Sequence, residues 1–278
     1  MPRLSPHPGE PPVSSFDDSE LRDFLATLAT VAARETLPRF RAGIAVDNKA
    51  AGSAFDPVTE ADRAAEAALR RAITARFPDH GIQGEEAADK PATSPYTWIL
   101  DPVDGTRSFV CGMPTWGTLV GLLADGAPYY GMMSQPFVGE RFVGGGGRAE
   151  LVRADGTRVL ACRTDRTLAT ATLFATTPEM FAPGPEAAAF AALSARVQLT
   201  RFGADCYGYA LLAAGFVDLV VEANLGYYDI APVIPIVEAA GGVVSDWSGR
   251  PVRGGGRAVA AASPALLEAA LDILAGAP

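Results

Sequence analysis

The sequence predicts an α/β protein, strictly α+β, in which helices and sheets alternate in layers and form two lobes. Two segments near the N-terminus repeat apolar residues with the period of a helix, and a run of strands joined by short turns follows them. In the second half, strands and helices alternate, and the whole mixture suits a layered sandwich. With 278 residues and 49% hydrophobic side chains, the chain has ample apolar material for a core.

Two amphipathic helices are expected near the N-terminus, at residues 17–40 and 59–77, because apolar residues recur there at helical spacing. Thr59 followed three residues later by Asp62 approximates a capping box, so Asp62 could be no more than a helix cap. Residues 1–15 are rich in proline and lack the apolar segment of a signal peptide. They are expected to form a disordered tail.

The most informative segment is a strand that ends in two acids. Apolar residues 98–100 read as a buried strand, and Asp101-Pro-Val-Asp-Gly-Thr106 follows directly. Aspartate oxygens suit Mg²⁺, and the turn directs both carboxylates the same way. Gly105 permits close approach of a ligand to the backbone, and the amides of residues 105–108 could form an anion-binding nest. Metal and phosphate are suggested together, although Asp-Gly-Thr alone is commonly only a turn.

A meander of strands is expected after this segment, because apolar runs alternate with short turn sequences. Gly144–Gly147 lacks the lysine and helix of a phosphate-binding P-loop, so a hairpin turn is expected there. The lobes are expected at residues 16–147 and 148–278. The meander strands are expected at residues 117–123, 129–133, 141–143, 149–152 and 157–160.

The second half predicts alternating strands and helices. Asp229 is expected to begin one of these helices, with Pro232 in its first turn and Gly241-Gly242 after its end. Strands are expected at residues 172–175, 197–200, 216–221, 243–244 and 258–261, and further helices at residues 186–195, 206–214 and 264–274.

Composition excludes several classes of function. The net charge of −9 and the pI near 4.8 argue against nucleic acid or a membrane surface as the main partner, and no apolar run is long enough to span a bilayer. The three cysteines form no CxxC motif, and this spacing indicates reduced cytosolic thiols. They are Cys111, Cys162 and Cys206. His7 and His80 are too few for a histidine zinc site, so hydrolysis would depend on carboxylates, hydroxyls and metal.

Three separated motifs together resemble the inositol monophosphatase family of Mg²⁺-dependent phosphatases. They are Gly84-Glu-Glu86, the segment 101–106, and Tyr228-Asp-Ile-Ala231 with 238–242 downstream. The resemblance runs from about Phe16 to the C-terminal helix, and it implies the inositol monophosphatase/fructose-bisphosphatase-like fold, with α-β-α-β-α layers in one catalytic domain. A homodimer in the cytoplasm is also implied.

Within the family, residues 201–207 and 104–109 look most like the histidinol-phosphate phosphatase branch. The resemblance implies two or three Mg²⁺ ions. Four carboxylates this close would raise one another's pKa strongly without cations, so the cluster itself predicts metal. The implied metal ligands are the carboxylates of Glu85, Asp101, Asp104 and Asp229 and the carbonyl of Val103.

The same resemblance implies the catalytic groups. Glu85 and Thr106 would orient the attacking water, and Asp62 would hydrogen-bond Thr106. The backbone amides of Gly105 and Thr106 would hold the phosphate. In the family the loop carrying Lys49 can close over the metals, but a solvated lysine is an equal alternative.

Substrate selection is expected in the second lobe. Glu222 lies where the family contacts the alcohol part of its substrate, and Asp205 adds a second acid. Two carboxylates suit the ammonium and imidazole groups of L-histidinol phosphate better than the hydroxyls of inositol. Asp205 could equally cap the following helix. Arg107 could pair with an acid or with phosphate, and this stays open.

Three functions are therefore compared. The first is histidinol-phosphate phosphatase, a step of histidine biosynthesis. The second is another phosphatase of the same fold, acting on inositol 1-phosphate, fructose bisphosphate or 3'-phosphoadenylate nucleotides. The third is a non-catalytic regulator or RNA-associated protein, which the intact acids and the acidic pI argue against.

Overall fold

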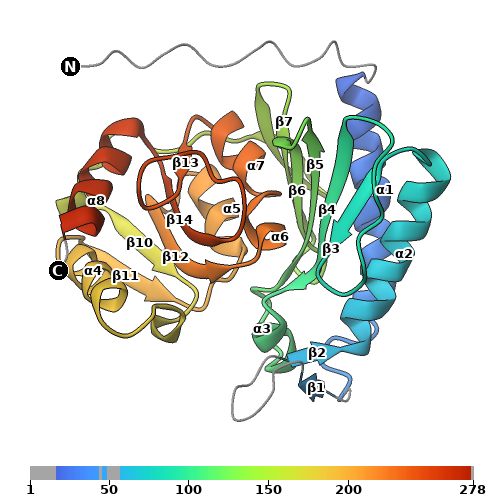
Figure 1. Ribbon diagram of the computed structural model, residues 1–278, viewed down its shortest axis with the longest axis horizontal. Helices are drawn as coiled ribbons and strands as arrows, with labels where there is room; N and C mark the ends of the chain where they lie inside the picture. The colour runs from blue at the N-terminus through green and yellow to red at the C-terminus, as the bar shows by residue number, and fades with distance from the viewer. Residues whose placement is uncertain (1–16, 44–45, 49–56, 277–278) are drawn as a thin grey trace.

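The computed structural model describes residues 17–43, 46–48 and 57–276. Helices and sheets alternate in five layers, α-β-α-β-α, from α1 and α2 on one side to α4 and α8 on the other (Figure 1). The predicted layered fold is confirmed. None of the described helices is both long and apolar enough to cross a membrane.

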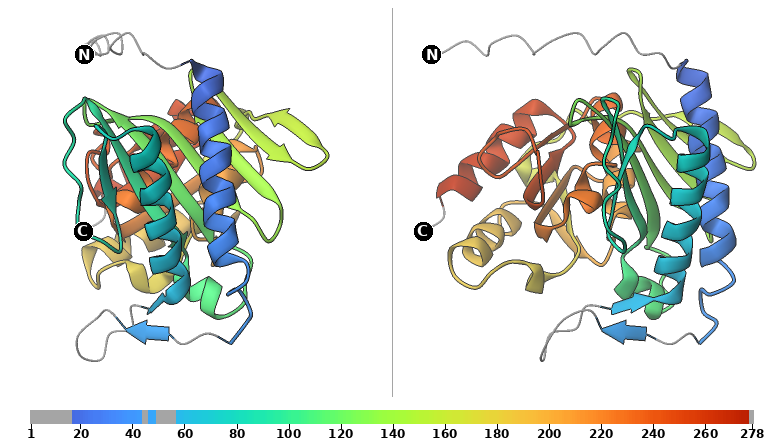
Figure 2. Two further views of the ribbon diagram at one scale, coloured as in Figure 1. Left: turned by 90° about the vertical axis from the view of Figure 1, so that its right-hand side faces the viewer. Right: turned by 45° about the vertical axis from the view of Figure 1, so that its right-hand side comes forward.

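The first layer is the pair of helices α1 (Asp18–Thr36) and α2 (Glu60–Arg76), which run side by side across the outer face of the first sheet (Figure 2). Their apolar faces bury Leu25, Leu28, Leu69 and Ile73 against strand residues such as Trp98. Burial of these faces removes apolar surface from water and fixes both helices on the sheet.

The first sheet has seven strands in sequence order, and only its first pair is parallel. Gly145–Gly147 turn with positive φ, as the expected hairpin requires, and fold β8 back on β7. Strands β8 and β9 also pair in this sheet. The first sheet therefore extends beyond residue 147, where the first lobe was expected to end. The strands are β3 (Gly81–Gly84), β4 (Tyr96–Asp104), β5 (Gly117–Ala124), β6 (Ala127–Gln135), β7 (Glu140–Gly145), β8 (Arg148–Arg153) and β9 (Gly156–Val159).

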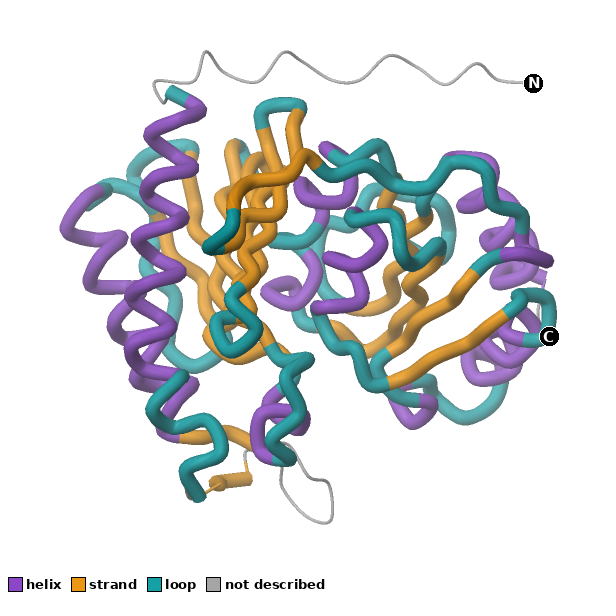
Figure 3. Tube along the Cα trace, turned by 180° about the vertical axis from the view of Figure 1, so that it is seen from behind, coloured by secondary structure: helices purple, strands orange, loops and turns teal. Residues whose placement is uncertain are grey.

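The middle layer lies between the two sheets (Figure 3) and contains α5 (Tyr207–Ala213), α6 (Tyr227–Ile230) and α7 (Ile234–Ala239). A row of glycines on neighbouring strands, Gly121, Gly131 and Gly144, faces this layer. A Cβ on Gly131 would lie 1.8 Å from the carbonyl oxygen of Pro232. The glycine row therefore lets the backbone between α6 and α7 lie directly on the sheet.

The second sheet has the strand order β11-β10-β12-β14-β13, with β10 parallel to both of its neighbours. Outer helices α4 (Pro185–Ser194) and α8 (Pro264–Gly276) cover it, with Phe190 and Leu266 in the shared core. The strands are β10 (Thr172–Ala175), β11 (Leu199–Phe202), β12 (Leu219–Leu225), β13 (Val243–Ser245) and β14 (Gly256–Ala261).

The helix expected to begin at Asp229 is corrected in two respects. It begins earlier, with Gly226 as its N-cap and Asp229 as its third residue, and it divides into α6 and α7. Pro232 and Pro235 have no N–H group, so they cannot continue the hydrogen-bond ladder of one helix. The smaller elements are β1 (Val46–Asn48), β2 (Pro57–Thr59), α3 (Thr106–Val110), η1 (Leu168–Thr170) and η2 (Pro178–Met180).

Candidate active site

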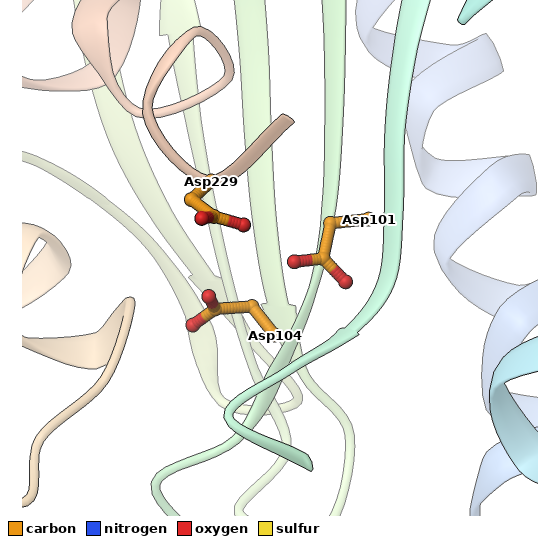
Figure 4. A group of neighbouring side chains, drawn as sticks. All are labelled: Asp101, Asp104 and Asp229. Carbon is orange, nitrogen blue, oxygen red and sulfur yellow. The ribbon is translucent and has the colours of Figure 1, made fainter. Parts of the chain in front are cut away.

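Three carboxylates from the two halves of the chain meet at the carboxyl end of β4. Asp101 and Asp104 belong to β4, and Asp229 belongs to α6. One oxygen from each lies within 4.8 Å of the others, and Figure 4 shows the three carboxylates close together at the end of β4. Asp101 is only 1% exposed.

The end of β4 explains the position of the first two acids. The pairing of β4 with β5 is interrupted between Asp101 and Asp104. There the backbone amide of Val103 donates 3.1 Å to Oδ1 of Asp101, and the Thr118 hydroxyl donates 2.8 Å to the carbonyl of Pro102. This local turn places Asp101 and Asp104 on the same side of the strand end.

Asp229 is held by its own helix. Its Oδ2 accepts a hydrogen bond of 2.7 Å from the backbone amide of Gly226, which is the N-cap of α6. An acid in the first turn of a helix is favoured by the helix dipole. Asp229 therefore both caps α6 and belongs to the carboxylate cluster.

The acids resist ionisation in the protein alone. Burial, followed by the neighbouring carboxylates, raises the pKa of Asp101 and Asp104 well above the usual range. Burial also raises the pKa of Asp229 to about 7, although the Gly226 amide opposes the shift. A bound cation would offset this repulsion, so a cluster of one buried and two half-buried acids suits a metal better than it suits a core.

The donor set fits a hard divalent cation. A cavity of about 570 Å³ is lined by Glu85 and Val103 together with the three clustered acids. All of the side-chain donors are carboxylate oxygens, the type that Mg²⁺ prefers. The cavity thus brings together the five residues predicted as metal ligands, and its wall also includes Gly105, Thr106 and Arg107.

Thr106 lies beside these acids at the start of α3. Its hydroxyl lies 3.4 Å from Oδ1 of Asp62 and 3.1 Å from the carbonyl oxygen of Val103. The other oxygen of Asp62 accepts from the amide and hydroxyl of Thr59, completing the predicted capping box. Both interpretations of Asp62 are therefore realised, as the cap of α2 and as a contact of Thr106.

A second cavity, of about 330 Å³, continues from the first and shares Asp104, Thr106 and Asp229 with it. Its wall adds Asp205 and Glu222, the two acids expected to select the substrate. Gly105 and Arg107 also line both cavities. Lys49 lies outside the described residues.

Asp205 packs directly on the turn after β4. It has a positive φ of 48°, and a Cβ on Gly105 would lie 2.9 Å from the Asp205 side chain. The hydroxyls of Ser108 and Thr115 both donate to Oδ2 of Asp205. Burial raises the pKa of Asp205 while these hydrogen bonds oppose the shift. Gly105 is thus required by close packing as well as by its own φ of 80°.

Glu222, only 3% exposed, belongs to a hydrogen-bonded group. Its Oε1 accepts from both the amide and the hydroxyl of Thr176, at 3.0 and 2.6 Å, and its Oε2 accepts from the Tyr209 hydroxyl at 2.8 Å. Burial raises its pKa, and these donors oppose the shift. Oε1 is fully used by Thr176, whereas Oε2 keeps the capacity for one more donor.

Sequence reasoning missed the residues that hold the acids. The Cys206 amide donates 2.7 Å to Asp104, and Thr115, Thr176 and Tyr209 hold the two acids of the second cavity. Ser108 and Cys206 lie inside the segments 104–109 and 201–207, so the sequence offered a signal for both. Thr115, Thr176 and Tyr209 lie outside these segments and are distant in sequence from their partners.

The model of the inositol monophosphatase family matches residues 17–276. The bifunctional phosphatase IMPL2, chloroplastic, of Arabidopsis thaliana is 38% identical over 85% of this chain and 68% of its own length. A histidinol-phosphatase of Mycobacterium tuberculosis is 33% identical over 86% of this chain and 92% of its own length.

Solved structures agree with this assignment. The structure of an inositol monophosphatase from Zymomonas mobilis has a TM-score of 0.82 and 38% sequence identity, covering 94% of this chain and 100% of that one. The carboxylate cluster occurs on the same fold that the sequence motifs indicated. The chain belongs to the inositol monophosphatase family and is a phosphatase.

Proposed function

We propose that this phosphatase hydrolyses L-histidinol phosphate and depends on Mg²⁺. The observation that carries the choice of substrate is the pair of buried acids, Asp205 and Glu222, in the cavity that continues from the carboxylate cluster. The resemblance of residues 201–207 to the histidinol-phosphate branch supports the same choice, as do relatives named histidinol-phosphatase.

Two cation positions are proposed. Glu85 and the carbonyl of Val103 would hold one ion, and Asp101, Asp104 and Asp229 would hold another. When bound, Mg²⁺ would lower the pKa of a coordinated water and neutralise charge on the phosphate and leaving oxygens. A third ion stays a prediction of the resemblance.

The protein groups around the phosphate have separate proposed roles. Glu85 accepts the proton of the attacking water, and Thr106 orients that water while Asp62 accepts a hydrogen bond from the threonine hydroxyl. The amides of Gly105 and Thr106, at the start of α3, donate to the phosphate oxygens. Arg107, in the wall of both cavities, lies where it would meet either the phosphate or the rest of the substrate.

The leaving alcohol of L-histidinol phosphate carries an ammonium and an imidazole. We assign Oδ1 of Asp205 and Oε2 of Glu222 to these groups, because the other oxygen of each acid already accepts two hydrogen bonds. A cation would favour the charged form of both buried acids and so compensate for their desolvation. A neutral polyol gives no such compensation.

The test is phosphate release from L-histidinol phosphate, inositol 1-phosphate, fructose 1,6-bisphosphate and 3'-phosphoadenosine 5'-phosphate, each with Mg²⁺ and with EDTA. A clear preference for L-histidinol phosphate in kcat/KM, abolished by EDTA, supports the proposal. Equal or better turnover of the other esters would leave a phosphatase of this family but overturn the choice of substrate.

Inositol 1-phosphate is the second candidate, because relatives with that activity in their names align as fully. An inositol-1-monophosphatase of Mycolicibacterium smegmatis is 33% identical over 94% of this chain. For this substrate Oε2 of Glu222 would accept a hydrogen bond from a ring hydroxyl, and Asp205 would have no cationic partner. Replacement of Asp205 therefore separates the two candidates.

A further inference from the structure

Glu66 is a buried acid of α2 that contacts the loop after β3. It is 1% exposed, and its two carboxylate oxygens accept from two consecutive backbone amides. Oε2 accepts 2.8 Å from the amide of Glu86, and Oε1 accepts 3.1 Å from the amide of Ala87. These two amides follow Glu85 directly, so the carboxylate of Glu66 fixes the chain on the C-terminal side of that residue.

Arg70, one turn further along α2, completes the contact. Its Nε donates 2.7 Å to Oε1 of Glu66, while its two terminal nitrogens donate to the carbonyls of Ala88 and Ala87 at 3.0 and 2.9 Å. The buried charge of Glu66 is thus paired, and the donors and acceptors of the same loop are both satisfied. We call Glu66 and Arg70 together the α2 clamp.

The chain on the N-terminal side of Glu85 is fixed as well. The Glu85 amide donates 3.2 Å to the carbonyl of Leu100 in β4, and Gly84 pairs with the same residue. A Cβ on Gly84 would lie 2.4 Å from Oε1 of Glu66. Gly84 thus has no room for a side chain while the Glu66 carboxylate keeps its place.

The same helix also contacts Thr106, a second residue of the candidate active site. Asp62, four residues before Glu66, is also buried and lies within hydrogen-bond distance of Thr106. Residues four apart lie on one face of a helix, so α2 presents two buried acids to the site. One meets the Thr106 hydroxyl, and the other holds the backbone that carries Glu85.

We infer that Glu66 is a positioning residue, which, with Arg70, sets the place of the Glu85 carboxylate for cation binding. The inference rests on the metal role proposed for Glu85, and it is independent of which phosphate ester is hydrolysed. Rigid support of a ligand lowers the ordering cost when the ion binds, and outer partners of ligands commonly affect metal affinity. A role in folding alone would leave the affinity unchanged.

The test is Mn²⁺ binding to the full chain without substrate, measured by titration calorimetry and by electron paramagnetic resonance. Glu66→Gln keeps the size of the side chain but turns an acceptor into an NH₂ group that faces a backbone amide. We expect the affinity of this variant for Mn²⁺ at the site that includes Glu85 to fall by about 10- to 100-fold. In turnover assays, high Mg²⁺ should restore most of the lost rate, with KM for the ester little changed.

Asp218→Asn is the matched control. Asp218 is 0% exposed and accepts from Arg163 and from the Thr172 amide, so it repeats the chemistry of Glu66 away from the carboxylate cluster. It should lower the thermal midpoint as Glu66→Gln does, while its Mn²⁺ affinity stays that of the wild type. Equal losses of affinity in both variants would overturn the inference.

Glu85→Ala gives the decisive comparison. If Glu66 acts through Glu85, then adding Glu66→Gln to Glu85→Ala weakens Mn²⁺ binding no further. Gly84→Ala, which pushes against Glu66 without removing its charge, should weaken binding in the wild-type background and serves if Glu66→Gln does not fold. Unchanged affinity in both Glu66→Gln and Gly84→Ala would overturn the inference. Absence of Mn²⁺ binding by the wild type would instead overturn the metal site on which it rests.

Discussion

The backbone amide of Cys206 donates a hydrogen bond of 2.7 Å to Oδ2 of Asp104. Cys206 immediately precedes α5 in the middle layer, whereas Asp104 ends β4 of the first sheet. The bond fixes one of the three clustered acids to the other half of the chain. Asp104, like Asp229, lines both cavities, so the position of α5 bears on the proposed metal and substrate sites alike.

Replacement of Asp104 by Asn should separate activity from stability. We expect phosphatase activity to fall by at least about 100-fold, more than the loss of an outer partner of a ligand commonly costs. Without Mg²⁺ the thermal midpoint should rise, because the variant removes a carboxyl whose pKa is raised by burial and by Asp229. Phosphate release and calorimetry in EDTA measure the two effects.

Asp272→Asn is the control for this substitution, because Asp272 is exposed on α8. It should change neither quantity. A thermal midpoint in EDTA that falls in Asp104→Asn would show that the carboxylate stabilises the metal-free protein, contrary to the burial argument.

Metal removal should give a characteristic pH dependence. The raised pKa values mean that the folded, metal-free protein holds protons that the unfolded chain has released. The stability that protonation contributes is fully present below about pH 4, the unfolded pKa, and is lost as the pH rises through the folded pKa. For Asp229 that folded pKa is about 7.

The thermal midpoint in EDTA should therefore fall as the pH rises through this window, and Mg²⁺ should raise the midpoint more at high pH, since binding displaces protons. Asp229→Asn should flatten the dependence in EDTA. Calorimetry across the window, with and without Mg²⁺, measures both slopes. If Mg²⁺ raised the thermal midpoint equally at the low and high ends of this pH window, metal binding would not be coupled to the release of these protons.

Removal of the Asp205 carboxylate should change substrate preference. Hydrogen bonds to charged groups contribute about 1.5–3 kcal/mol, so Asp205→Ala should lower kcat/KM for L-histidinol phosphate by roughly 10- to 100-fold. The loss for inositol 1-phosphate should be much smaller, because that substrate has no cation. The ratio of kcat/KM for the two esters is the measurement.

Thr115→Val controls for disturbance of the Asp205 side chain, since it removes one donor to Oδ2 and keeps the carboxylate. It should preserve most of the preference for L-histidinol phosphate. If Asp205→Ala lowers kcat/KM for both esters equally, Asp205 has a packing role against Gly105 and does not select the substrate.

Alanine substitutions at Gly121 and Gly131 of the glycine row should destabilise the fold by amounts that depend on how closely Pro232 approaches each glycine. A Cβ on Gly131 would meet the Pro232 carbonyl oxygen at 1.8 Å, whereas a Cβ on Gly121 would lie 3.2 Å from the nearest atom of Pro232. Gly131→Ala should cost more than the 1–3 kcal/mol or so that overpacking commonly costs, and Gly121→Ala should cost less than Gly131→Ala.

Denaturant unfolding measures the two costs, and Mn²⁺ affinity reports whether α6 has moved with Asp229. We expect Gly131→Ala to lose affinity and Gly121→Ala to retain most of it. If both variants were as stable as the wild type, the close contact between the glycine row and Pro232 would not exist in solution.

Sequence was sufficient where the signal is local. The segment from Asp101 to Thr106 combines a strand end, two acids and a turn glycine, and its structure follows from those adjacent residues. The capping box of Thr59 and Asp62 is equally local. The layered sandwich of helices and sheets also followed from the periodic apolar patterns, whereas the order of its five layers came from the resemblance to the family.

Sequence was insufficient where a partner lies far along the chain. Glu66 and Arg70, four apart on a helix, look like an exposed ion pair, and only the folded loop at residues 86–88 shows that the acid is buried. The start of α6 was misplaced for a related reason. Asp229 resembles an N-cap, but its carboxylate reaches back to the amide of Gly226 instead.

The two cavities are built largely from different parts of the chain. The groups proposed to cut the phosphate ester lie mostly before residue 110. Thr176, Asp205, Tyr209 and Glu222, which line the cavity proposed to hold the leaving alcohol, all come later. Mutation can therefore alter which alcohol is accepted while the hydrolytic groups are inherited intact. Such a separation lets one ancestral catalyst give rise to enzymes for different metabolites through a few exchanges around a single recess.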